Sequence, residues 1–575
     1  MMKSGAIVVL TILLSSCGGG SGGHSAPNNA APTITPIAAQ SVIEGEVLSI
    51  NAIAADSDGS IQTYHWQQLS GVTVVLNNDT QANVSVTAPA VSMDSDIVLR
   101  VSVTDNAGAT AQTTVLITVL NSVYSSPPHR VNFVSDQDLS AFFAFFDHRQ
   151  LPRIDITISV DEWQAFIAEL QRDLQSDRYF KAAVTITSAG SSVTVTDTGF
   201  RLRGNTTRRI PEQDGQFYSV HFKLRFNETF DLAPNTLPYL ERDERRYAQM
   251  RALNLKSRRP GYDDSQMREL YAYDLLNQIG LKASLATTVQ LYLIIGERRI
   301  NYGLYTAIEP VDKSFLRKRF GDVDNEGNLY RCLWQSGGPA TLSPKHPSVA
   351  DANWIGVGDQ LIQTPSYDLK TNEAHPDHGA LINLITQLDQ LNGDALKTWL
   401  DANVDVTSLL NYLAMNMLVG MPDDYRAMGN NYYLYFTPDN RITFIPYDYD
   451  SAFGSGWHPF DTATVGIYDW PSLSGSLSGD AWYDAHPLSD KLLQIPAYRQ
   501  RYEQLLRQFV ADAPLGNFSF ALYSAKFAQL KALYDPDGDD RIVSDVVDAV
   551  PWMHNEQQDY FEQKVASIRQ QVGTP

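Results

Sequence analysis

Two aspartates, Asp448 and Asp450, directly follow an apolar run in the sequence IPYDYDSAFG (residues 445–454). Four more polar side chains come just before the preceding apolar run, in MPDDYRAMGNN (421–431): Asp423, Asp424, Asn430 and Asn431. Carboxylate and amide oxygens are the ligands that Mg²⁺ and Mn²⁺ prefer in proteins. The alternative is that these residues form helix caps and turns at a solvated edge.

The residues between these two polar groups predict a β-hairpin. Residues 432–436 (YYLYF) and 441–446 (RITFIP) are strand-like, and TPDN between them is a turn sequence. An antiparallel hairpin brings both polar groups to the same edge, so the sequence predicts a divalent-metal site there. The order aspartate, asparagine, hairpin, aspartate is also that of a kinase active site, although the HRD, DFG and consensus glycine-rich sequences are absent.

Several separated blocks carry a family resemblance. They are GFRLRGNTTRR, LNLKSRRPGYDDSQMRELYAYDLLNQIGL, VQLYLIIGERRINYGLYTAIEPVDKSFLRKRFG, GNLYRC, NNYYLYF and FIPYDYDSAFG. In this order the chain resembles the CotH-type kinase family, named for a spore-coat protein, from about Ile154 to Gly454. The resemblance implies an atypical protein-kinase-like α+β fold with two lobes. It also implies phosphate transfer from ATP to a protein or other surface acceptor, with Mg²⁺ or Mn²⁺.

The resemblance also implies roles for the acidic residues. The catalytic aspartate of the family falls at Asp424 or at its neighbour Asp423, and the spacing leaves both open. The metal-binding asparagine falls at Asn431 and the metal-binding aspartate at Asp448. Asp450 follows as a second ligand or a support.

Nucleotide-binding residues are implied in the same way. The RGN block, formed by Arg203, Gly204 and Asn205, matches residues that approach phosphates. Glu309 matches a glutamate that pairs with a basic residue or reaches the metal. The family often carries a lysine where this chain has Ser219 and Val220. Three basic residues are candidates to replace that lysine: Lys223, Arg225 and Lys256.

The N-terminus predicts export and a membrane anchor. Lys3 precedes a short apolar run from Ala6 to Leu14, and LLSSC ends at Cys17. Residues 1–17 therefore resemble a lipoprotein signal peptide in which Cys17 is lipidated, and Gly18 favours the outer membrane or cell surface. An ordinary cleaved signal with an incidental cysteine is the alternative.

Short β-rich runs alternate with turn sequences from residue 32 to 122, after a Gly/Ser-rich tether at 18–31. This spacing predicts an all-β immunoglobulin-like sandwich, and DSDGSIQTYHW and VSVTDNAG resemble PKD or cadherin-like modules. Three acids of this module, Asp56, Asp58 and Asp105, are either Ca²⁺ ligands or turn formers.

The remaining boundaries follow from composition. We expect a linker at 123–150, the CotH-like domain at 151–486 and a helical extension at 487–575. The net charge of −21 and the absence of a long basic run argue against nucleic acid as a partner. Two functions stay open: a lipid-anchored metal-dependent kinase, or a kinase-like surface protein that assembles or binds without catalysis.

Overall fold

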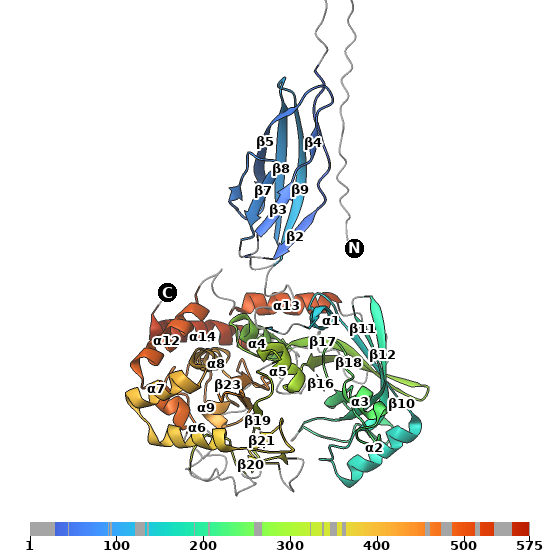
Figure 1. Ribbon diagram of the computed structural model, residues 1–575, viewed down its shortest axis with the longest axis vertical. Coiled ribbons are helices and arrows are strands. Elements are labelled where there is room, and N and C mark those ends of the chain that lie inside the picture. The colour runs from blue at the N-terminus through green and yellow to red at the C-terminus, as the bar shows by residue number, and fades with distance from the viewer. Residues whose placement is uncertain are drawn as a thin grey trace, which may run out of the picture. The chain divides into compact units, whose positions relative to one another are not determined.

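The computed structural model of the chain describes the following residues: 29–43, 45, 47–89, 91, 95–120, 133–134, 137–188, 190–204, 207–257, 267–322, 324–335, 338–344, 354–358, 364–454, 460–472, 486–511, 518–533 and 555–573. They fall into two compact units (Figure 1). The first comprises those within Met1–Pro89 and Asp96–Thr118, and the second those within Ala90–Ser95 and Val119–Pro575.

The first unit is built from β-strands, as the sequence predicts. One sheet has the order β2-β9-β8-β5, a second has the order β3-β7-β6, and β1 pairs with β4. The strands are β1 (Thr33–Ile34), β2 (Gln40–Ile43), β3 (Val47–Asn51), β4 (Ala54–Ala55), β5 (Ile61–Ser70), β6 (Leu76–Asn77), β7 (Asn83–Thr87), β8 (Ser95–Asp105) and β9 (Thr110–Leu120). Every second residue of β8 is buried, and Trp66 is buried beside them with its indole N–H donating to Gln81 O.

The second unit contains a closed β-barrel with the strand order β10-β11-β12-β15-β16-β18-β17. Its strands are β10 (Arg153–Ile158), β11 (Phe180–Ser188), β12 (Ser191–Leu202), β15 (Phe222–Arg225), β16 (Ala252–Lys256), β17 (Ala286–Ile295) and β18 (Arg298–Ile308). Apolar residues alternate along these strands and fill one core. Elements around the barrel are α1 (Ser140–Phe145), α2 (Val160–Arg172), β13 (Glu212–Gln213), β14 (Gln216–Phe217), α3 (Leu237–Asp243), α4 (Met267–Gln278) and α5 (Lys313–Phe320).

Part of the predicted linker belongs to this unit. Helix α1 lies within the range 123–150, and Phe142, Phe145 and Phe146 are fully buried in the barrel core. The linker prediction rested on the proline-containing stretch and passed over the run of phenylalanines. Burial of these rings stabilises the barrel by roughly 2 kcal/mol each, so this segment is structural.

A second sheet in the same unit has the order β20-β21-β19-β22-β23. Its strands are β19 (Asn328–Cys332), β20 (Ile355–Gly356), β21 (Tyr367–Leu369), β22 (Tyr432–Phe436) and β23 (Ile442–Pro446). Helices pack with it: α6 (Gly379–Gln390), α7 (Gly393–Asn403), α8 (Val406–Val419), α9 (Tyr425–Met428), α11 (Pro487–Leu492), α12 (Pro496–Phe509), α13 (Phe520–Leu533) and α14 (Asn555–Val572). Figure 1 shows most of these helices on the opposite side of this unit from the barrel strands.

The hairpin predicted from the sequence is present as β22 and β23. Tyr432 faces Pro446 at its open end and Phe436 faces Ile442 near the turn. Both strands are buried along their whole length, because helix α8 packs against β23 and β19 pairs with β22. The predicted helices after residue 487 are also present, with 534–554 outside the described residues.

Candidate active site

The open end of the β22–β23 hairpin presents two polar residues from adjacent strands. Asn431 immediately precedes β22, and Asp448 is the second residue after the end of β23. Both have left-handed backbones, with φ of 52° for Asn431 and 59° for Asp448. Such a conformation is strained for residues other than glycine, and strain of this kind concentrates at functional sites. The hairpin thus brings its two polar ends to one edge, as the sequence predicts.

A lysine from the barrel joins the two aspartates. Lys256, the last residue of β16, places Nζ 2.6 Å from Asp448 Oδ1 and 3.2 Å from Asp450 Oδ2. The same Nζ lies 2.7 Å from Glu269 Oε2 on helix α4. Three carboxylates therefore converge on one buried ammonium group, and a strand of the barrel, a helix and the hairpin meet at this point.

The charges of this cluster shift one another's protonation. Burial acts to raise the pKa of Asp448, but the nearby Lys256 and Arg203 charges outweigh it and lower that pKa to about 2. Burial, followed by repulsion from Asp448 and Asp450, raises the pKa of Glu269 to about 7 despite its contact with Lys256. Burial opposes the charge on Lys256, yet the three carboxylates raise its pKa well above the ordinary value. The lysine therefore stays protonated at neutral pH.

Asp423 lies beside the hairpin end and is held by both asparagines. Asn430 Nδ2 donates to Asp423 Oδ1 at 2.8 Å, and Asn431 Nδ2 donates to Asp423 Oδ2 at 2.9 Å. Burial and the charges of Asp448 and Asp450 raise the pKa of Asp423 to about 7, while the bond from Asn430 acts in the opposite direction. Because Asn431 uses its amide N–H to hold Asp423, its carbonyl oxygen remains the atom that can face a cation.

Asp424 has a different environment from its neighbour. Its Oδ1 accepts from Ala427 N and caps helix α9, and its Oδ2 accepts from Asn416 Nδ2 at 2.8 Å. The residue is 2% exposed. Asn416 in turn accepts from the Tyr449 hydroxyl. These bonds are those of a structural helix cap, and they leave Asp423 as the more accessible of the two aspartates.

The RGN block approaches the hairpin from the barrel. Arg203 Nη2 donates to the Tyr447 hydroxyl at 2.7 Å. Although burial opposes its charge, the neighbouring Tyr447 and Asp448 raise the pKa of Arg203. Gly204 has φ of 110°, and a Cβ there would meet Thr207 Oγ1 at 2.4 Å, so the turn requires glycine. Asn205 lies outside the described residues, as does Cys17.

The other predicted nucleotide-binding residues lie in two further places. Lys223 and Arg225 are on β15, where Lys223 pairs in register with Arg201. Glu309 is 2% exposed and forms ion pairs with Arg319 and Lys318, which are 1% exposed each. Of the two alternatives for Glu309, pairing with basic residues is the one observed.

Sequence reasoning did not single out Glu269. It lies 13 residues after Lys256 and on the helix that follows its strand. The available signal was the order strand, lysine, helix, glutamate, which in protein kinases supplies a lysine–glutamate pair. Lys256 was only one of three basic residues considered, and its register opposite the hairpin could not be read before the barrel was known.

The donor atoms at the hairpin end are oxygens, the element that a hard divalent cation prefers. Asp448, Asp450 and the Asn431 carbonyl supply oxygen, which Mg²⁺ and Mn²⁺ prefer. Within the described ranges, no three His, Cys, Asp or Glu side chains are arranged to hold a metal ion. Lys256 instead bonds both aspartates in this structure.

The three predicted Ca²⁺ ligands of the first unit, Asp56, Asp58 and Asp105, each accept a hydrogen bond from another residue of that unit. Asp105 Oδ1 accepts from Ala107 N and Ala109 N, its Oδ2 accepts from Asn29, and Asp58 accepts from Ala30 N. In the part of the chain that the structure describes, no helix has the length and hydrophobicity of a membrane span.

Comparison with known proteins identifies the class of this chain. Residues 200–515, more than half of the sequence, match the family described as CotH kinase protein, and residues 37–119 match a PKD domain family. The chain belongs to the CotH kinase family and carries an N-terminal PKD domain.

Three similar proteins each match less than a third of this chain. Chitinase A of Pseudoalteromonas piscicida is 37% identical over 89 residues, which is 16% of this chain, and the match spans about a tenth of that relative (11%). The PKD1 domain of Vibrio anguillarum Epp is 21% identical, covers 16% of this chain and 99% of that domain, and has a TM-score of 0.12. The SrpA adhesin of Streptococcus sanguinis is 16% identical, covers 30% of this chain and 94% of that protein, and has a TM-score of 0.15.

Proposed function

We propose that this chain is a metal-dependent kinase that transfers the γ-phosphate of ATP to a protein or other acceptor outside the cytoplasm. The observation that carries the proposal is the convergence of Lys256, Glu269, Asp448 and Asp450 beside the Asp423–Asn431 pair. Phosphoryl transfer needs a cation to face the phosphates, acidic ligands for a metal and an acid to orient the nucleophile. Each of these groups has a matching side chain in this cluster.

The roles follow from position and charge. Asp448, Asp450 and Asn431 would hold Mg²⁺ or Mn²⁺, and the bound ion would neutralise charge on the transferring phosphate. Lys256, fixed by Glu269 and permanently charged, would contact phosphate oxygens. Asp423 would accept a hydrogen bond from the acceptor hydroxyl, since it is the less enclosed aspartate and Asp424 is committed to capping α9.

Nucleotide binding would occur between the barrel and the second sheet, which we propose act as the two lobes of a kinase-like domain. Lys256 and Arg203 come from the barrel side, while Asp448 and Asn431 come from the sheet side. A site shared in this way allows a ligand to draw the two sides together. Lys256 would thereby take the role of the lysine that the sequence lacks at Ser219 and Val220.

We place this activity at the cell surface. The signal-like segment ending at Cys17 and the PKD domain support an exported protein held by a lipid at the membrane, with the outer membrane or cell surface favoured. In the same proposal, Asp56, Asp58 and Asp105 of the PKD domain would bind Ca²⁺.

One observation supports a second function. Lys256 bonds both Asp448 and Asp450 directly, so one ammonium group already offsets part of the acidic charge without a metal ion. A protein in which this arrangement is permanent would retain the fold as a surface-assembly or binding protein without transferring phosphate.

The decisive experiment compares ATP binding and phosphate incorporation in the parent and two variants. Calorimetry with ATP in Mn²⁺ or Mg²⁺ measures binding, and radiolabelled γ-phosphate measures incorporation into the protein itself and into a peptide library. We expect Asp423→Asn to bind ATP as the parent does and to lose at least ~10²-fold in transfer, the size of a general acid–base contribution.

Asp389→Asn is the matched control, because Asp389 is an exposed position of α6. It is expected to behave as the parent in both measurements. If the parent binds no ATP with either metal, the kinase proposal is wrong and the binding-protein function replaces it.

A further inference from the structure

The barrel carries a second charged row beside the Lys256 cluster. Phe200 and Leu202 of β12 and Phe222 and Leu224 of β15 are buried in the barrel core. The residues between them therefore face the other way, because side chains alternate along a strand. Arg201 and Lys223 are direct neighbours on that face.

The pair Arg201 and Lys223 lies further along the strands than the level of the Lys256 cluster. The N–H of Arg203 donates to His221 O, which continues the β12–β15 pairing by one residue beyond Leu202 and Phe222. Arg203 reaches Tyr447 and the hairpin end. Arg201 and Lys223 each lie two residues further along, a distance of about 7 Å at the rise of a β-strand. The two rows are separate but belong to the same face.

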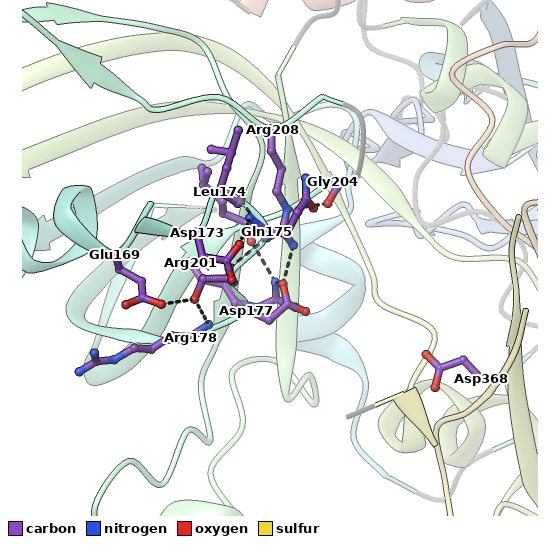
Figure 2. Close-up of polar contacts among 12 residues, drawn as sticks. Glu169, Asp173, Leu174, Gln175, Asp177, Arg178, Arg201, Gly204, Arg208 and Asp368 are labelled. Atoms are coloured by element: carbon purple, nitrogen blue, oxygen red, sulfur yellow. Dashed lines mark hydrogen bonds and ion pairs between the residues drawn. The ribbon is translucent and has the colours of Figure 1, made fainter. Parts of the chain in front are cut away.

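Basic side chains outnumber acids around Lys223. Arg201 and Arg208 both pair with a single carboxylate, Asp177, whose side chain is 59% exposed. Figure 2 shows the two arginines converging on Asp177. A water-exposed carboxylate compensates two guanidinium groups only partly.

The second sheet brings a further cation near this row. Arg331 of β19 and Lys370 share one buried carboxylate, Asp368, at 2.9 and 2.7 Å. Asp368 stands apart from the Asp177 group in Figure 2. Arg331 pairs in register with Tyr433, the Tyr433 ring packs against the Tyr447 ring at 5.1 Å, and the Tyr447 hydroxyl accepts from Arg203 of the barrel. Arg331 therefore approaches the barrel from the second sheet, and its charge helps to lower the pKa of Lys223.

Lys223 is the member of this group whose ammonium has no direct partner. Among the residues that the structure describes, its Nζ forms no hydrogen bond or ion pair, although its charge helps to lower the pKa of Asp177. Tyr179 acts to raise the pKa of Lys223, but burial and the charges of Arg201, Arg225 and Arg331 outweigh it and lower that pKa. Arg201 and Arg225 also lie over the Tyr179 ring, at 5.1 and 5.7 Å from its centre. A bound anion would remove the repulsion among these cations.

We propose that Lys223, together with Arg201 and Arg331, forms an anion-binding subsite that takes a phosphate or carboxylate group next to the Lys256 cluster. The charge of Lys256 is already shared by three carboxylates. The Lys223 subsite is net positive and needs no metal to attract an anion. The anion belongs either to the nucleotide or to an acidic group of the acceptor, and binding of a free anion does not depend on phosphate transfer.

Binding of inorganic phosphate in EDTA tests the subsite directly. Calorimetry or phosphorus NMR at constant ionic strength, with chloride as the reference anion, measures the affinity of the intact protein. We expect saturable binding by the parent and at least tenfold weaker binding by Lys223→Met. Lys313→Met is the matched control, since Lys313 is half-exposed on α5 and pairs with exposed Glu326.

The source of the anion is then identified with the same Lys223→Met variant. A tenfold loss of ATP affinity with unchanged adenosine affinity assigns the subsite to a nucleotide phosphate. Unchanged ATP affinity with a raised KM for an acidic acceptor peptide assigns it to the acceptor.

Three results would overturn the inference: no phosphate binding by the parent above chloride, equal binding by Lys223→Met and Lys313→Met, or no change in either ligand arm. If ATP binding is absent altogether, the kinase proposal fails, while the phosphate titration in EDTA still decides the subsite.

Discussion

Two buried clusters of acids and bases in this chain differ in charge balance and in exposure. Around Lys256, three carboxylates share one lysine, and Asp448 and Asp450 keep 25% and 17% of their side chains exposed. Around Glu309, one carboxylate is shared by Lys318 and Arg319, and all three side chains are at most 1% exposed. The first cluster has an excess of acid and an open side, whereas the second is closed.

The difference indicates which cluster can do chemistry. Both oxygens of Glu309 accept from Arg319, and Oε2 also accepts from Leu285 N, so no atom is left for a metal or phosphate. Asp448 has a strained backbone at a strand end. Its cluster contains more carboxylates than basic groups. Strain and unbalanced charge cost stability and are retained where a ligand offsets them.

Removing Asp448 should give the largest effect on function. In Asp448→Asn the residue loses its charge but nearly keeps its shape, and Lys256 retains Glu269 and Asp450. We expect phosphate incorporation to fall by at least ~10²-fold, as when one electrostatic contact of a transition state is lost. Incorporation from labelled ATP in Mn²⁺ measures it, with circular dichroism to verify folding. Wild-type transfer by this variant would place the metal elsewhere.

Opening the closed cluster should affect stability instead. In Glu309→Gln, Lys318 and Arg319 lose their shared charge inside the protein, and breaking a buried pair typically costs about 3–5 kcal/mol. Urea unfolding followed by tryptophan fluorescence measures the free energy of unfolding. Glu326→Gln removes an exposed partner of Lys313 and should cost less than about 1 kcal/mol. Loss of ATP affinity in folded Glu309→Gln, without loss of stability, would contradict the structural role.

The sequence was most informative where chemistry and local structure coincide. The hairpin and its polar ends could be predicted because strand-forming residues, a turn sequence and acids are all local signals. The Lys256–Glu269 contact could not, because it depends on how β16 registers against β18 and how α4 packs, which are long-range pairings. Lys223, Arg225 and Lys256 cannot be told apart as basic strand residues in the sequence. Only the strand register shows that Lys256 reaches the hairpin and that Lys223 lies beside Arg201.

The sequence alone could not assign different roles to the neighbours Asp423 and Asp424, whereas their burial in the structure does. Asp424 caps α9 and contacts Asn416 of α8, a partner eight residues away that the sequence does not identify. The phenylalanines of α1 were missed for a related reason. Their burial depends on a barrel formed by strands that follow later in the chain.

A third buried cation, Lys564, extends the comparison and should give the smallest effect. It is 1% exposed, and its Nζ contacts Met417 Sδ at 3.7 Å. Burial lowers the pKa of Lys564 to about 7, and Asp461 only partly offsets it. The unfolded chain holds this proton up to its ordinary pKa of 10.5, so the unfolded state binds more protons between about pH 7 and 10.5. This lysine therefore destabilises the fold fully below about pH 7, and the cost declines as pH rises through that window.

Lys564→Met should stabilise the protein by at least ~1 kcal/mol at pH 7, with the gain shrinking toward pH 10. Urea unfolding of variant and parent at both pH values measures the difference. A gain that does not change with pH would mean that packing, and not the buried charge, distinguishes Lys564 from the paired cations at Glu309.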